Sequence, residues 1–210
     1  MTDLRTTLLS DGGSDRTLIP ILDWLLQEKV KTLSLPGTRW ANFGYLRKPL
    51  QNLQERVLCA VKNYPCEILF IHRDAEAQNP DSRRTEIVNA VQQARIHPPA
   101  VCVIPVRMTE AWLLLDEAAI RSASGNPRGR LPLNLPALAS IERFPDPKES
   151  LFQALKIASE QRGRRLRDLR VEERRHRVAE LMNYQCLYEL PAFQCMEKEL
   201  DTTLTANGWT

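Results

Sequence analysis

Residues 67–76 read Glu-Ile-Leu-Phe-Ile-His-Arg-Asp-Ala-Glu, and this stretch decides the class of fold. After Glu67 the chain is continuously apolar to Ile71, as in a parallel strand that is buried on both faces of a sheet. Asp74 and Glu76 follow at the point where that strand should end. Because ligands bind at the carboxyl ends of strands in open α/β sheets, the stretch predicts a central strand with a site beside it.

Strand and helix patterns alternate on both sides of this stretch. Short apolar runs predict three further strands, at residues 4–10, 31–35 and 100–106. Apolar residues at helical spacing predict helices at about 14–28, 49–63 and 83–94, and a fourth from Thr109 onward. This order predicts an α/β fold, with a mostly parallel sheet sandwiched by helices.

The second half of the chain has a different pattern. Residues 122–150 are rich in Pro, Gly and Asn, which predicts an ordered loop or crossover. Only helical patterns follow, at about 149–162, 171–183 and 192–204. We therefore expect an α/β core over residues 1–125 and a C-terminal helical extension over residues 126–210, packed together as one structural unit.

Length and composition limit the class of protein. The chain has 210 residues and a net charge of +3, which neither requires nor excludes nucleic acid as a partner. Its five cysteines include no CxxC pair, so we expect free thiols in a reducing cytoplasm. No signal peptide and no apolar stretch of about 18 residues is present, so we expect no membrane segment.

Acidic residues follow three of the predicted strands. Asp11 and Asp15 lie in the turn Asp-Gly-Gly-Ser-Asp after the first strand, and Glu110 follows the last strand. Together with Asp74 and Glu76, they predict a divalent-metal site, since clustered carboxylates repel each other unless a cation or a proton intervenes. Each also has a purely structural interpretation, as an acid in the first turn of a helix or as a polar strand end.

Several arginines are candidates for binding a phosphate backbone. Arg83 and Arg84 open a helix next to the Asp74 loop, and Arg107 precedes Glu110. Residues 162–177 are dense in arginine and include Arg164 and Arg165. Interleaved acids leave open the alternative that this stretch is a solvated helix face held by i,i+4 ion pairs.

These residues together resemble the Toprim-like fold of topoisomerases, primases and overcoming-lysogenization-defect nucleases. That family has a Glu-Gly loop after its first strand, matched here by Asp11-Gly12, and an Asp-x-Asp after a later strand, matched by residues 74–76. More narrowly, the chain is similar to small bacterial Toprim-like proteins, whose genes often neighbour ATPases in phage-defence loci.

The narrower resemblance extends over most of the chain through short motifs. The loop Glu-Gly-Pro-Thr-Glu of those proteins is matched by residues 11–15, and their Glu-Ala-Trp-Leu-Leu by residues 110–114. Their late Pro-Lys is similar to Pro147-Lys148, and their final Pro-Ser-Phe to residues 191–193. Asp replaces Glu at positions 11 and 15, and Glu replaces Asp at position 76, so each carboxylate shifts by about one methylene.

The resemblance implies a nuclease that hydrolyses phosphodiesters of nucleic acid with Mg²⁺ or Mn²⁺. Asp11, Asp74 and Glu76 would hold the metal, with Asp15 and Glu110 supporting a second ion or orienting water. Lys148 would stabilise the charge of the transition state if it folds over the site. Arg83, Arg84, Arg107, Arg164 and Arg165 would position the nucleic-acid backbone.

Two other functions fit the same residues. The first is a non-catalytic partner subunit that binds an ATPase through its arginines and the aromatic residues at 40, 43 and 45. Pairing of the acids with Arg73 and Arg107 would favour it, whereas convergence of Asp11, Asp74 and Glu76 on one point would favour catalysis. The second is a hydrolase of small phosphates or nucleotides, which an enclosed pocket would favour.

Overall fold

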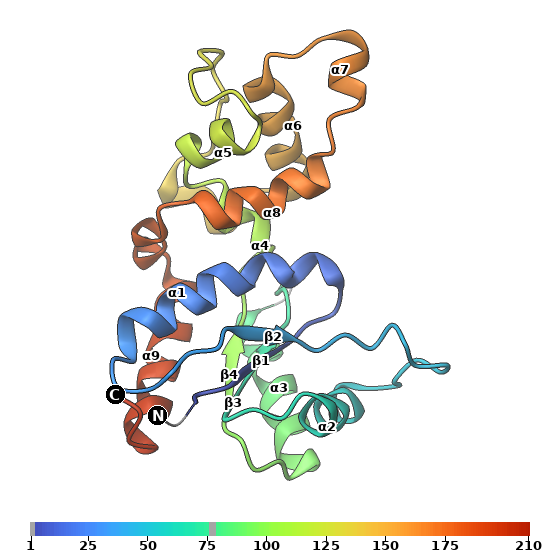
Figure 1. The fold of residues 1–210 in the computed structure, drawn as a ribbon, viewed down its shortest axis with the longest axis vertical. Coiled ribbons are helices and arrows are strands. Elements are labelled where there is room, and N and C mark those ends of the chain that lie inside the picture. Colours follow the sequence, from blue (N-terminus) through green and yellow to red (C-terminus); the bar gives the residue numbers. More distant parts are fainter. Residues whose placement is uncertain (1–2, 76–78) are drawn as a thin grey trace.

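The computed structural model describes residues 3–75 and 79–210, and these form an α/β fold with a helical C-terminal region (Figure 1). Its sheet has four strands, all parallel, in the order β2-β1-β3-β4. The strands are β1 (Thr6–Leu9), β2 (Thr38–Trp40), β3 (Ile68–His72) and β4 (Ala100–Val103). The predicted parallel sheet between helices, followed by a helical region, is therefore confirmed.

Helices cover both faces of the sheet. Successive residues of β3 point to opposite faces, so Ile68 and Phe70 belong to one core cluster, and Leu69 and Ile71 to the other. The smaller cluster is completed by α2 (Leu53–Asn63) and α3 (Pro80–Ala94). The larger cluster is completed by α1 (Ile19–Lys29), which follows the 3₁₀ helix η1 (Gly13–Leu18), and by helices of the C-terminal region.

The C-terminal region shares the larger core cluster with the sheet. Its elements are α4 (Thr109–Leu113), α5 (Glu117–Ala123), η2 (Leu138–Arg143), α6 (Pro147–Ser159), α7 (Gly163–Arg167), α8 (Val171–Leu181), η3 (Tyr184–Glu189) and α9 (Pro191–Ala206). Buried side chains such as Leu155, Val178 and Leu200 join Phe70 of β3 in that cluster. The apolar core is thus continuous between residues 1–125 and 126–210, although the predicted boundary itself stays a prediction.

Helix α9 also covers the outer edge of the sheet. β4 is an edge strand, and the carboxylate of Glu199 on α9 accepts a hydrogen bond from the backbone N–H of Cys102, at 3.1 Å. This contact satisfies an edge donor that would otherwise be available to another chain. None of the helices in residues 3–75 and 79–210 is long and apolar enough to cross a membrane.

The second strand was predicted at the wrong residues. Only Ser34 of residues 31–35 pairs with the sheet, through an isolated bridge to Asp3, and the strand itself begins at Thr38. Gly37, at a φ of 92°, turns the chain so that Thr38 lies beside Thr6, and their hydroxyl groups are 2.8 Å apart. This turn places the strand after the predicted residues 31–35.

Two other predicted segments also differ. The helix expected from Thr109 ends at Leu113, and α5 starts anew at Glu117, where the side chain of Asp116 accepts from the backbone N–H of Ala119. The loop expected at residues 122–150 contains η2 and the start of α6.

Candidate functional site

The candidate site lies at the carboxyl edge of the sheet, where β1 and β3 end side by side. Leu9 of β1 is in register with Ile71 of β3, so the residues that follow the two strands leave the sheet side by side. These are Ser10 and Asp11 after β1, and Arg73 and Asp74 after His72. Figure 1 shows that β4 points toward the helical region, so this edge of the sheet faces α4 and α8.

His72 lies at the centre of this edge and is 2% exposed. Its Nδ1 lies 3.0 Å from the carbonyl oxygen of Val103, and because a carbonyl only accepts, Nδ1 is the donor. The other nitrogen, Nε2, lies 3.5 Å from Oδ1 of Asp74 and 4.0 Å from Oδ2 of Asp15. One imidazole nitrogen therefore faces carboxylates from the segments that follow two neighbouring strands, β1 and β3.

Asp15 is held in place by the glycine turn between β1 and α1. Its carboxylate accepts hydrogen bonds from the backbone N–H of Gly12 and from the hydroxyl of Ser14, both at 3.0 Å. A side chain at Gly13 would meet the ring of Trp40 at 3.4 Å, so glycine allows the turn to approach β2 closely. Asp15 thus lies in the first turn of η1, as its structural interpretation predicts, while its role toward a metal stays a prediction.

Asp11 is paired with two arginines. Arg73, its neighbour across the sheet, lies 3.2 Å from Oδ1 of Asp11, and Arg56 of α2 binds the same oxygen. Arg56 also donates to the backbone carbonyl of Ser10. The carboxylate of Asp11 is therefore neutralised from two sides, an arrangement that the sequence allowed for only through Arg73.

Arg83 binds the backbone just after β3. Its Nε donates to the backbone carbonyl of Asp74 at 3.1 Å, and its Nη1 lies 3.0 Å from Glu86, which also binds Arg73. Arg83 thus ties Asp74 to the start of α3. Glu76, predicted as a metal ligand, lies outside the described residues.

The fit of these residues to a divalent cation is partial. Asp15 and Asp74 approach one point and offer the oxygen ligands that Mg²⁺ and Mn²⁺ prefer. Asp11 is engaged by guanidinium groups instead. Within residues 3–75 and 79–210, no group of three or more His, Cys, Asp or Glu side chains is arranged to hold a metal ion.

Glu110 and Lys148 belong to a different set of contacts. Oε1 of Glu110 is 2.6 Å from Nη1 of Arg175 on α8, and both side chains are under 10% exposed. Arg175 also contacts Glu172 at 3.1 Å, and Glu172 lies 3.9 Å from Nζ of Lys148. The two predicted site residues are thus linked through α8, and neither contacts the acids around His72 through a hydrogen bond or an ion pair within the described chain.

The predicted phosphate-binding arginines are dispersed. Arg84 forms an ion pair with Glu199 of α9, and Arg107 is half-buried next to α4. Arg164 and Arg165 are exposed on α7, in the part of the helical region that is farthest from the sheet (Figure 1).

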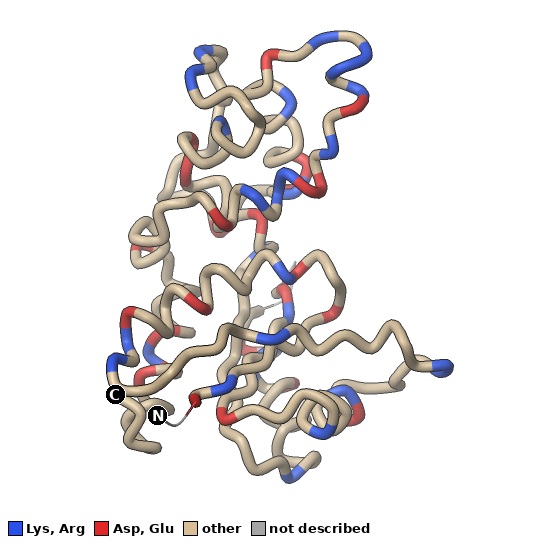
Figure 2. The backbone as a smooth tube through the Cα atoms, viewed as in Figure 1, with Lys and Arg blue, Asp and Glu red and all other residues tan. Residues whose placement is uncertain are grey.

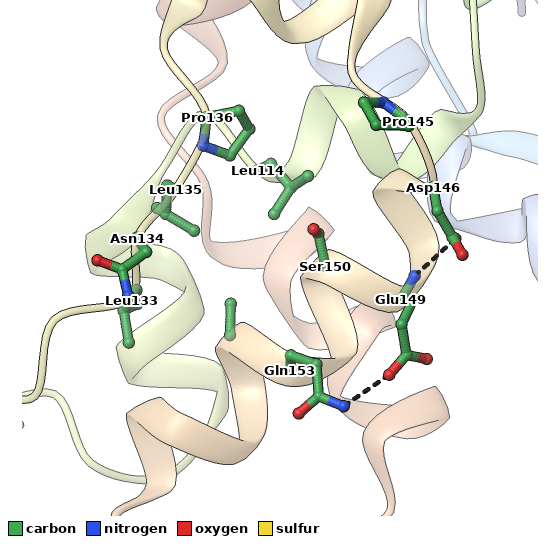
Figure 3. A pocket seen from close by; sticks show the side chains of 11 residues that line it. Leu114, Leu133, Asn134, Leu135, Pro136, Pro145, Asp146, Glu149, Ser150 and Gln153 are labelled. Carbon is green, nitrogen blue, oxygen red and sulfur yellow. Dashed lines mark hydrogen bonds between the residues drawn. The ribbon is translucent and has the colours of Figure 1, made fainter.

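A cavity of about 210 Å³ lies apart from this edge, between α6 and residues 133–136 (Figure 3). Its polar groups already bond to one another: Asp146 accepts from the backbone N–H of Glu149, and Glu149 accepts from the side chain of Gln153. Two carboxylates and no Lys or Arg line it, so it is a poor site for phosphate.

Two residues of the site, Arg56 and His72, were not predicted from the sequence. Arg56 reaches Asp11 from α2, and no local signal marks it among the other arginines. His72 had a signal, because a polar ring at the end of a buried strand and next to an acid is a candidate acid or base.

Comparisons of the chain with models of known families, with curated proteins and with solved structures found no match.

Proposed function

We propose that this chain is a Toprim-like protein that hydrolyses phosphodiester bonds of nucleic acid with Mg²⁺ or Mn²⁺. The observation that supports it is the approach of Asp15, on η1 after β1, and Asp74, just after the adjacent strand β3, to Nε2 of the buried His72. In open α/β sheets, ligands bind at the carboxyl ends of the parallel strands, which is where these carboxylates lie.

Each residue has a defined task in this proposal. Asp74 and Asp15 would hold the cation, with Asp11 and Glu76 as further ligands, and such a cation would supply activation of water and neutralisation of charge on the phosphate. His72 lies against the two acids through Nε2, and its ring is held in place by the contact of Nδ1 with Val103. Arg56 and Arg73 bind a phosphate oxygen, for which they exchange their contact with Asp11.

The pairing of Asp11 with Arg56 and Arg73 supports a second candidate function. In that alternative the protein is a non-catalytic subunit, its acids are neutralised by internal ion pairs, and its exposed arginines bind an ATPase or another partner. The two candidates differ in whether the carboxyl edge binds a divalent cation.

Cleavage of labelled DNA and RNA, single- and double-stranded, in Mg²⁺ or Mn²⁺ tests the first function. Wild type is compared with Asp74→Asn, which keeps the size of the side chain and removes its charge, and with Glu180→Gln, an exposed acid on α8. We expect Asp74→Asn to lower the cleavage rate by at least about 100-fold. Loss of a residue that only hydrogen-bonds a metal ligand already lowers activity about 10- to 100-fold, and loss of the ligand itself should cost more.

The control Glu180→Gln should cleave at the wild-type rate. Cleavage that persists in Asp74→Asn would show that the activity does not use this site. If folded wild type cleaves neither nucleic acid nor small phosphate esters, and calorimetry detects no binding of Mn²⁺, the partner-subunit function replaces the first.

A further inference from the structure

The helical region carries an exposed cluster of positive charge. We define the arginine arm as residues 162–170, which include α7. It contains a single acid, Asp168, and five exposed arginines: Arg162, Arg164, Arg165, Arg167 and Arg170. Figure 2 shows Lys and Arg gathered along this outer turn, at the end of the molecule away from the sheet.

Most of this charge is not neutralised by the protein. Arg164 lies 3.6 Å from Asp168, and Arg170 lies 2.8 Å from Glu173. Arg162, Arg165 and Arg167 have no carboxylate within 4.0 Å in the part of the chain that the structure describes. The two exposed pairs are weak in water, so the arm as a whole can attract an anionic polymer.

A groove of about 410 Å³ runs along the base of the arm, between α6, α7 and Leu131. Leu131, Ile157 and Leu166 form its apolar floor, and Lys156 and Arg162 add positive charge to its lining. Leu131 is 49% exposed, which leaves its apolar surface open to a ligand.

The one acid that lines the groove is already engaged. Glu160 accepts hydrogen bonds from the backbone N–H groups of Arg130 and Leu131, at 2.6 and 3.2 Å. These bonds lower the pKa of Glu160 and direct its carboxylate toward the backbone. Arg128 and Arg130, both exposed, lie on the segment that Glu160 ties down, and they extend the positive surface.

We propose that the arginine arm and its groove form an anchoring site for single-stranded nucleic acid. The arginines contact the phosphates, and the apolar floor contacts the face of an unpaired base, which a duplex keeps stacked inside its helix. The acidic cavity of Figure 3, in the same helical region, lacks the cations that such a ligand needs.

This inference deepens the proposed function and rests on it in one respect, since it takes the polymer to be nucleic acid. The arm is remote from the carboxyl edge of the sheet, so it can assist cleavage only of a strand long enough to reach both. A small phosphate or a mononucleotide would gain nothing from it.

The test is fluorescence anisotropy of labelled single-stranded DNA and RNA oligonucleotides with the full chain, in buffer without divalent cations. The arm variant combines Arg162→Ala, Arg165→Ala and Arg167→Ala. A matched control removes the same charge from three exposed lysines elsewhere, with Lys31→Ala, Lys62→Ala and Lys198→Ala. We expect the arm variant to bind about tenfold or more weakly, and its log–log salt slope to fall by about 2, since each phosphate contact contributes about 0.7.

A second variant tests the groove. Leu131→Ser removes apolar surface from an exposed position, and we expect it to reduce the preference for a single strand over a duplex of the same sequence. The inference is overturned if duplex binds wild type as tightly as single strand does, or if the arm variant binds like its control. It is also overturned if polyglutamate displaces the oligonucleotide at an equal concentration of negative charge, because that result would indicate an acidic protein partner.

Binding and cleavage separate this inference from the proposed function. Asp74→Asn should bind oligonucleotides like wild type even where it fails to cleave them. Arm-dependent binding without any cleavage would support the anchoring site and reject the nuclease. If the arm variant instead cleaves at the wild-type rate at low substrate concentration, the nuclease is supported and the anchoring site is rejected.

Discussion

His72 lies between the two carboxylates of the candidate site, and its ring nitrogens have different partners. Nδ1 donates to the carbonyl of Val103, while Nε2 faces Asp74 and Asp15. The same side chain thus contributes to the stability of the strand end and to the shape of the site. Substitutions that keep one nitrogen and remove the other separate these two contributions.

Asn at position 72 can present its amide nitrogen where Nδ1 lies, and it removes Nε2. We expect the free energy of unfolding of His72→Asn, measured in urea, to lie within about 1 kcal/mol of the wild-type value, because the asparagine amide can replace the hydrogen bond to Val103. His72→Phe leaves the buried carbonyl of Val103 without its donor, so its free energy of unfolding should be about 1–3 kcal/mol lower than that of His72→Asn.

Cleavage assays on the same two proteins complete the test. Both variants should lose activity if His72 positions Asp74 and Asp15 for a cation. Full activity in His72→Asn would restrict the histidine to a structural role.

At the scale of single elements, Glu160 fixes the segment that borders the groove. The carboxylate caps the backbone N–H groups of Arg130 and Leu131, and these hydrogen bonds lower its pKa in the folded protein. A carboxylate whose pKa is lower when folded stabilises the fold above its unfolded pKa, and this contribution is lost as pH falls through the folded pKa.

We therefore expect the segment to loosen at acidic pH. The amide resonances of Arg130 and Leu131, followed by NMR, should shift together as the pH falls below the unfolded pKa of a glutamate, about 4.3. Glu160→Gln should remove that transition, and Glu173→Gln, an exposed acid on α8, should preserve it. The role of Glu160 would be contradicted if the amide chemical shifts of Arg130 and Leu131 stayed constant from pH 7 down to the pH at which the protein unfolds.

Elements with a strong local pattern were predictable from sequence, and elements that depend on tertiary contacts were not. The apolar run at 68–71 and the run from Ala100 mark β3 and β4 because a parallel strand that is covered on both faces has no polar face. β2 has only three residues and no apolar run, and it pairs where Gly37 turns the chain toward β1.

The same distinction applies to the candidate site. Acids at strand ends can be read from sequence, because each follows an apolar run directly. Their partners cannot, since Arg56 reaches Asp11 from α2, and Arg175 reaches Glu110 across 65 positions. Whether an acid is available to a cation or already neutralised is therefore decided by the tertiary structure.

At the scale of the whole molecule, a buried ion pair joins α4, the first helix after the sheet, to α8. Glu110 follows β4 and opens α4, while Arg175 lies on α8, and the pair is almost fully buried. Charges in such an environment are costly to desolvate, so each is stable only with the other present. The pair thereby specifies how α8 packs beyond the carboxyl edge, where the candidate site lies.

A double-mutant cycle tests this connection. Glu110→Ala leaves Arg175 buried without its partner and should lower the free energy of unfolding by about 3–5 kcal/mol. Replacing both residues by methionine should restore most of that loss, because apolar residues of similar volume often substitute well for a buried pair. The exposed pair of Arg177 and Glu180 is the matched control, and its removal should cost no more than about 0.5 kcal/mol.

Activity measured on the double methionine variant then separates structure from chemistry. If Glu110 only fixes α8, the restabilised protein should cleave like wild type, because the acids around His72 are untouched. If it is stable and inactive, Glu110 acts in the site as the resemblance implied, and the ion pair with Arg175 is a state that the substrate must displace. A loss in Glu110→Ala no larger than that of the exposed control would mean that the pair does not hold α8 against α4.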